Sequence, residues 1–193
     1  MTSEKAPEPN LDSILNASKF LNGYAKGAGN EIHKFVKGLI LSKRMIKAIE
    51  SVLPSGKKVA WGQIRDGQRL SKEIDAIVFQ GDIETNWNEA GYGSDIGYFV
   101  VPSTQVIAII EIRGADNEMT TEEHEKLPRD KLIPFCRKVY QVYLYAESKK
   151  PGTTEKHLTD LKRSGYADVF YLSSRGIPNT TDWTRFIKTM RGL

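Results

Sequence analysis

Residues 106–113, with the sequence VIAIIEIR, form an almost continuous run of β-branched and apolar side chains. A strand without polar alternation is typical of the centre of a sheet that is covered on both faces. The run therefore predicts a layered α/β domain built around this strand. Its polar end is unexpected, because burying the ionised side chain of Glu111 costs several kcal/mol unless a cation or hydrogen bonds compensate.

The rest of the chain predicts helices and strands on both sides of this run. Apolar residues at three- and four-residue steps indicate helices, and short β-branched runs bounded by turn residues indicate strands. The predicted helices cover residues 11–21, 32–53, 129–148 and the segment around 183–190, and the predicted strands cover residues 59–64, 74–79 and 167–172. The first two strands predict a hairpin, and residues 81–98 predict a long connection. This order indicates a mixed α/β fold.

Length and composition predict one folded domain. A chain of 193 residues can bury one full core. Residues 1–10 are polar and rich in proline, which predicts a flexible tail before a single domain over residues 11–193. The single cysteine, Cys136, excludes a disulfide within one chain, and no segment approaches the roughly 18 apolar residues of a membrane span. We therefore expect a cytoplasmic protein that does not enter a membrane.

Two acids stand at strand positions where apolar residues are expected. Asp75 interrupts the predicted strand 74–79, and Glu111 lies near the end of the central run. A shared divalent cation would explain two such acids. Residues two apart in a strand project to the same face, so Glu111 and Arg113 are expected to point together.

These residues, in this order, resemble the PD-(D/E)xK nuclease superfamily. The string Glu73-Ile74-Asp75 is followed by the apolar strand that ends in Glu111-Ile112-Arg113, as in the E-x-K motif of that superfamily. Gln141 and Tyr145, on the predicted helix 129–148, are similar to the Q-x-x-x-Y element of its RecB-like branches. The resemblance implies the restriction-endonuclease-like fold, a mixed β-sheet flanked by helices.

The resemblance also implies roles for these residues. Asp75 and Glu111 would be ligands of Mg²⁺ or Mn²⁺, and the carbonyl of Ile112 would be a further ligand. Gln141 and Tyr145 would orient this metal site or contact a phosphate. Glu31 matches a helical acid that some branches place beside the metal, although an acid in the first turn of a helix is also expected for the macrodipole.

Arg113 departs from the pattern, which has lysine at this position. A guanidinium stays protonated and is planar, whereas an ammonium is compact. Arg113 could clamp a phosphate or hold the attacking water, and it could equally mark a domain that keeps the fold without cutting. A third interpretation is that Asp75, Glu111 and Arg113 form ordinary salt bridges.

Basic residues accompany these motifs, and the net charge of +4 is compatible with a polyanionic partner. Arg69, Lys72, Lys131 and Lys138 are candidates for contacts to a nucleic-acid backbone, or else are solvated surface charges. The sequence thus predicts a metal-dependent nuclease that acts on DNA, and the resemblance places it in a bacterial or phage defence or restriction system. The alternatives are an inactive nuclease-like module that binds nucleic acid or a protein partner, and a subunit that cuts only as a homodimer or beside another chain.

Overall fold

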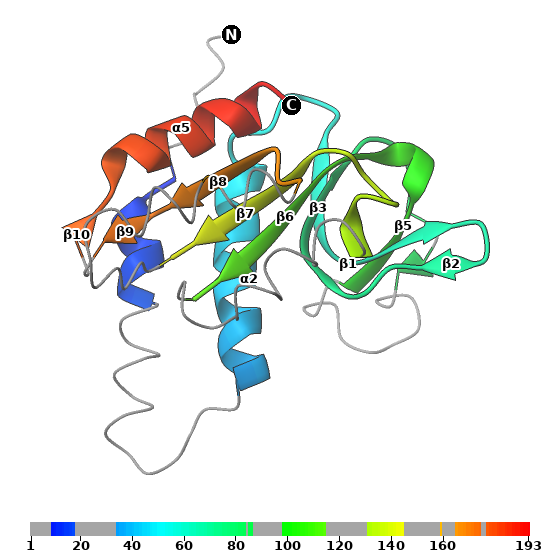
Figure 1. Cartoon of the computed structure of the whole chain (residues 1–193), viewed down its shortest axis with the longest axis horizontal. Helices are drawn as coiled ribbons and strands as arrows, with labels where there is room; N and C mark the ends of the chain where they lie inside the picture. Colours follow the sequence, from blue (N-terminus) through cyan, green and yellow to red (C-terminus); the bar gives the residue numbers. More distant parts are fainter. Residues whose placement is uncertain are drawn as a thin grey trace, which may run out of the picture.

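The computed structural model has a mixed β-sheet with helices packed against it (Figure 1). The fold is described for residues 9–17, 34–83, 85–86, 98–114, 131–144, 159, 165–174 and 177–193, and the structural statements below concern these residues. The helices are 11–17, α2 (Lys34–Glu50) and α5 (Thr180–Arg191). The strands are β1 (Lys58–Asp66), β2 (Arg69–Leu70), β3 (Ile74–Phe79), β4 (Thr85–Asn86), β5 (Tyr98–Pro102), β6 (Val106–Arg113), β7 (Val139–Tyr143), β8 (Asp168–Tyr171), β9 (Ser173–Ser174) and β10 (Ile177–Pro178).

The main sheet runs in the order β4-β5-β1-β3-β6-β7-β8, with β2 paired to β1. The predicted hairpin is present, because β1 and β3 pair antiparallel. The predicted central strand is β6, which lies between antiparallel β3 and parallel β7. Strands β7 and β8 continue the sheet in parallel. The sheet is therefore mixed, as the motif order indicates.

Alternate residues of the central strand enter two different hydrophobic clusters. Ala108, Ile110 and Ile112 belong to the first cluster, which also contains residues of all three described helices. Ile109 belongs to the second cluster, on the other face of the sheet, where the segment 131–136 supplies Leu132. Burial on both faces explains why β6 has no polar alternation before its end.

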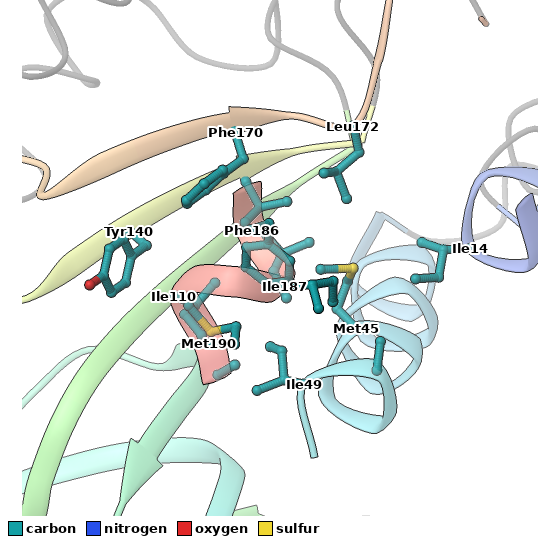
Figure 2. Packing of buried hydrophobic residues seen from close by; sticks show 14 of the residues in the cluster. Ile14, Met45, Ile49, Ile110, Tyr140, Phe170, Leu172, Phe186, Ile187 and Met190 are labelled. Carbon is teal, nitrogen blue, oxygen red and sulfur yellow. The ribbon is translucent and has the colours of Figure 1, made fainter. Parts of the chain in front are cut away.

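The helices are amphipathic and cover the same face of the sheet. In α2, Leu41, Met45 and Ile49 recur every four residues and are almost fully buried. In α5, Phe186 and Met190 pack into the same cluster, and Figure 2 shows them facing Met45 and Ile49 across the core. The cluster fixes α2 relative to β3 and β6, the two strands that carry the predicted acids.

One predicted element is wrong. The segment 129–148 was expected to be a helix, but Val139–Tyr143 forms strand β7, and all five of its residues are buried. The apolar residues of the segment 129–148 recur at three- and four-residue steps, which is why a helix was expected. Those in β7 are β-branched or aromatic and are buried on both faces of the sheet, as in a central strand. Strand β5 was not predicted either. It begins at Tyr98, where the expected connection 81–98 ends.

No helix among the described residues is long and apolar enough to cross a membrane.

Candidate active site

Asp75 lies in a β-bulge of strand β3. The pairing of β3 with β1 shifts by one residue between Ala60 and Gly62. The extra residue is on β3, because the partners of these two, Ile77 and Ile74, are three positions apart. A bulge changes the direction in which a side chain points. Asp75 therefore does not follow the simple alternation of its strand.

Both oxygens of Asp75 accept hydrogen bonds. Ser42 Oγ on α2 donates to Oδ1 at 3.0 Å, and the backbone N–H of Ile112 donates to Oδ2 at 2.8 Å. The carboxylate is therefore held between α2 and the end of β6. Ser42 is itself buried, which makes this support part of the core.

Glu111 directly precedes Ile112 on β6. It is almost completely buried, with 1% of its surface exposed. The ladder between β3 and β6 ends at the pair Ala76–Ile110, so Asp75 and Glu111 follow directly on the two strands. The carboxylate of Glu111 accepts a hydrogen bond on Oε2 from Lys72 Nζ at 2.7 Å. Its other oxygen, Oε1, is buried and has no hydrogen-bond partner among the residues that the structure describes.

The environment of Glu111 opposes its ionisation. Burial raises the pKa of this carboxyl, and the nearby charge of Asp75 raises it further. Lys72 and Arg113 lower the pKa without cancelling these effects. A buried carboxylate whose charge is incompletely compensated, beside a second acid, is an arrangement that a bound cation would stabilise.

Arg113 shares the face of Glu111, as its spacing predicts. One of its terminal nitrogens lies 3.5 Å from Glu111 Oε2, and its buried Nε has no partner within the described part of the chain. The guanidinium is thus farther from the carboxylate than the ammonium of Lys72. The interpretation of Glu111 and Arg113 as an ordinary ion pair explains this contact but leaves Glu111 Oε1 unexplained.

Gln141 lies beside Glu111 on strand β7 rather than on a helix. The parallel register pairs these two residues. Gln141 Nε2 donates to the backbone carbonyl of Glu111 at 3.1 Å and to that of Val142 at 3.3 Å. Its Oε1 is buried, and none of the described residues donates to it. Strand pairing therefore places Gln141 beside Glu111, and its predicted role at a metal site or a phosphate stays a prediction.

Tyr166 is a residue near Glu111 that the sequence did not indicate. Its ring is buried in the second cluster, and its hydroxyl has no hydrogen-bond partner in the described ranges of the chain. Burial raises the pKa of Tyr166 above its ordinary range, and the charge of Glu111 adds to this effect. Nothing in the local sequence signals this proximity, because Tyr166 lies just before β8 and comes near Glu111 only through the packing of the sheet.

The donor set fits a hard divalent cation held partly by water. Among the described residues, no three His, Cys, Asp or Glu side chains are grouped to hold a metal ion. Mg²⁺ commonly binds through one or two carboxylates and keeps several waters, so a pair of acids is sufficient. The buried, unpaired acceptors Glu111 Oε1 and Gln141 Oε1 are the atoms that a cation or its bound waters would satisfy.

The other predicted residues have different positions. Lys72 contacts Glu111, although it was expected to contact nucleic acid. Arg69 is exposed on β2, where its guanidinium lies 5.9 Å from the centre of the Phe135 ring, and Lys131 and Lys138 are exposed near β7. Glu31 and Tyr145 lie outside the described residues, and their roles remain predictions.

The strand order and the acid-bearing strands β3 and β6 define the class of fold. It is the restriction-endonuclease-like fold, a mixed sheet flanked by helices, as predicted. Solved structures similar to this chain include NucC from two bacteria. The cAAA-bound form of NucC from E. coli MS115-1 has a TM-score of 0.63 and 16% sequence identity, and the match covers 94% of this chain and 88% of that one.

Two further solved structures of NucC are also similar to this chain. The cAAA-bound form of NucC from P. aeruginosa ATCC27853 has a TM-score of 0.61 at 14% identity, covering 94% of this chain and 89% of that one. The apo form of the E. coli protein has a TM-score of 0.54 at 12% identity, covering 93% and 90%. No protein-family model and no curated protein matches the sequence. Likeness at these identities establishes the fold alone.

Proposed function

We propose that this protein is a metal-dependent nuclease that hydrolyses phosphodiester bonds of DNA, within a bacterial or phage defence or restriction system. The observation that carries the proposal is the adjacency of Asp75 and buried Glu111 at the end of the β3–β6 ladder. Burying Glu111 beside a second acid destabilises the metal-free protein. A cation bound between the two carboxylates would make their burial favourable. The fold shared with NucC supports the same class of function.

In this proposal Asp75 and Glu111 bind Mg²⁺ or Mn²⁺, with the carbonyl of Ile112 as a further ligand. The ion, when bound, activates water and offsets negative charge on the phosphate. The protein's own residues hold the ligands in place. Ser42 and the N–H of Ile112 orient Asp75, while Gln141 holds the backbone of Glu111. Ligands supported in this way need little rearrangement when the ion binds.

The proposed DNA contacts are electrostatic. Arg69, Lys131 and Lys138 are exposed cations, and Arg113 lies next to the carboxylate pair, where it can contact the scissile phosphate. Contacts of this kind make affinity fall steeply with salt concentration. The protein would act in the cytoplasm, as a homodimer or with a partner subunit. Because two similar structures contain cAAA, a ligand of that kind is a candidate regulator.

One observation favours a second function, an inactive module that binds nucleic acid or a protein partner. Arg113 replaces the lysine of the E-x-K motif, and its terminal nitrogen lies 3.5 Å from Glu111 rather than at hydrogen-bonding distance of a charged pair. A module of this kind would bind DNA in a salt-dependent way without cutting it.

The test is cleavage of supercoiled plasmid and linear DNA with Mg²⁺ or Mn²⁺, in the presence and absence of cAAA. Cleavage of RNA of the same sequence, compared with cleavage of the DNA, shows whether the protein prefers deoxyribose or ribose. Asp75→Asn and Glu111→Gln remove one proposed ligand each, and Glu50→Gln, an exposed acid at the end of α2, is the control. We expect cleavage by the wild type and the control, and none by the two site variants. Salt-sensitive binding without cleavage in any condition would support the inactive module instead.

A further inference from the structure

We propose that Lys72 provides the catalytic ammonium of this site, in place of the lysine that Arg113 replaces. The inference rests on the proposed nuclease function. Lys72 comes from the segment between β2 and β3, three residues before Asp75, and not from strand β6. In space it nevertheless reaches the carboxylate of Glu111.

The distances favour Lys72 over Arg113 as the principal cation. Lys72 Nζ lies 2.7 Å from Glu111 Oε2, whereas the nearest Arg113 nitrogen lies 3.5 Å from the same oxygen. The side chains of Lys72 and Arg113 are equally exposed, at 28%, and the side chain of Glu111 is 2% exposed, so the distances and not the exposure distinguish the two cations. The ammonium therefore connects a partly open surface to a buried acid, which is the position that a substrate phosphate would approach.

Hydrogen bonds to β1 and within the segment itself fix the backbone around Lys72. Ser71 Oγ accepts from the N–H of Ile64 at 2.8 Å and donates to the carbonyl of Lys72 at 2.6 Å. Gln63 Nε2 donates to the carbonyl of Ser71 at 2.8 Å. A lysine that contacts only solvent needs no such hydrogen bonds to its backbone, so these bonds indicate that the position of Lys72 is fixed.

The residue after Lys72 is held as well. Trp61 Nε1 donates to the carboxylate of Glu73 at 2.9 Å. Lys72 therefore lies between two anchored neighbours, Ser71 and Glu73, in a segment that belongs to no strand. Anchoring on both sides holds the ammonium close to its working position before any ligand binds.

An ammonium at this point has the required chemistry. It is a compact charge with three N–H donors, of which one is directed at Glu111. The others can hold the attacking water and a non-bridging phosphate oxygen. In the reaction the water oxygen bonds to phosphorus while the bond to the leaving sugar oxygen breaks; the water releases a proton to solvent, and the leaving oxygen takes one up. Lys72 stays protonated and stabilises the added negative charge.

The experiment compares Lys72→Gln, Lys72→Arg and the double variant Lys72→Gln/Arg113→Lys in the DNA cleavage assay. Lys188→Gln, an exposed lysine on α5, removes the same charge far along the chain and is the control. Thermal unfolding of each variant, with and without Mg²⁺, shows that the fold and the metal response are kept. Asp75→Asn is included so that loss of the nuclease site itself is recognised.

We expect Lys72→Gln to lower kcat by about 10²–10³-fold, the loss typical of one transition-state donor. Lys72→Arg keeps the charge beside Glu111 and should still lose most of the rate, because a guanidinium cannot replace the compact donor. The double variant should regain at least about tenfold over Lys72→Gln, since a lysine at position 113 restores an ammonium to the site. If Lys72 had only a structural role, a lysine at position 113 on β6 would not restore the rate that Lys72→Gln loses.

Two results would overturn the inference. Full activity of Lys72→Arg would show that the residue is only a counter-ion of Glu111, and near wild-type activity of Lys72→Gln would show that it is not needed. Either result, with Asp75→Asn inactive, leaves the nuclease proposal standing. Absence of cleavage by the wild type in every condition would refute the nuclease proposal and this inference together.

Discussion

Replacing Glu111 by glutamine is expected to stabilise the metal-free protein at neutral pH, although it removes a residue of the proposed active site. Burial and the charge of Asp75 raise the pKa of Glu111 above its ordinary value of 4.5 in spite of Lys72 and Arg113. The folded protein therefore favours the neutral side chain. Glutamine has nearly the same shape and carries no charge.

The size of the effect follows from two opposing contributions. A buried polar atom without a partner costs about 1–3 kcal/mol, with charged groups at the upper end, so the neutral amide of glutamine lowers the cost at Glu111 Oε1 by about 2 kcal/mol without removing it. Loss of charge in the hydrogen bond from Lys72 costs roughly 1 kcal/mol. The net gain is about 1 kcal/mol in the free energy of unfolding. For a chain of this length that corresponds to an increase in Tm of about 2–4 °C.

The pH dependence has a definite sign. A carboxyl with a raised pKa in the folded state holds its proton more tightly there than in the unfolded chain, so wild-type stability falls as pH rises through the folded pKa. Below about pH 4.5 both states of Glu111 are protonated, and this contribution is fully present. The advantage of Glu111→Gln should therefore be largest at neutral pH and shrink toward acid pH.

The assay is thermal unfolding in EDTA between pH 5 and 8, with Glu50→Gln as a control that changes an exposed acid. Addition of Mg²⁺ should reverse the order of stability. A ligand at 100 times its Kd stabilises the form that binds it by about 2.7 kcal/mol, and the glutamine variant lacks one proposed ligand. A variant less stable than the wild type in EDTA at pH 7.5, or an advantage that grows as pH falls, would refute the reasoning.

Three further substitutions test the packing. Tyr166→Phe removes a buried hydroxyl without a partner and should leave urea-induced unfolding unchanged or up to about 1 kcal/mol more stable; a clear loss would mean that the hydroxyl is bonded. Phe186→Ala should cost about 3–5 kcal/mol in the same measurement, and a cost below 1 would contradict its position in the core. Gly62→Ala should prevent folding, seen by circular dichroism, because a Cβ there would lie 1.9 Å from the Phe99 carbonyl oxygen at a φ of +153°.

The elements predicted best were those whose pattern depends on local periodicity. Strand β6, helices α2 and α5 and the β1–β3 hairpin follow from apolar spacing and turn residues. Strand β7 was mistaken for a helix because a short strand buried on both faces has no period of its own. Strand β5 pairs in parallel with β1, a long-range contact that no local signal records.

Asp75 and Glu111 can be recognised as exceptional without any coordinates, because a charged residue in an apolar strand is costly wherever the strand lies. The groups that surround them follow from the folding of the whole chain. The bulge that turns Asp75 toward Ser42 requires β1 as a partner, and the contact of Lys72 with Glu111 joins residues 39 positions apart. Such contacts depend on strand register and on the packing of α2, which are set by the whole core and not by the residues nearby.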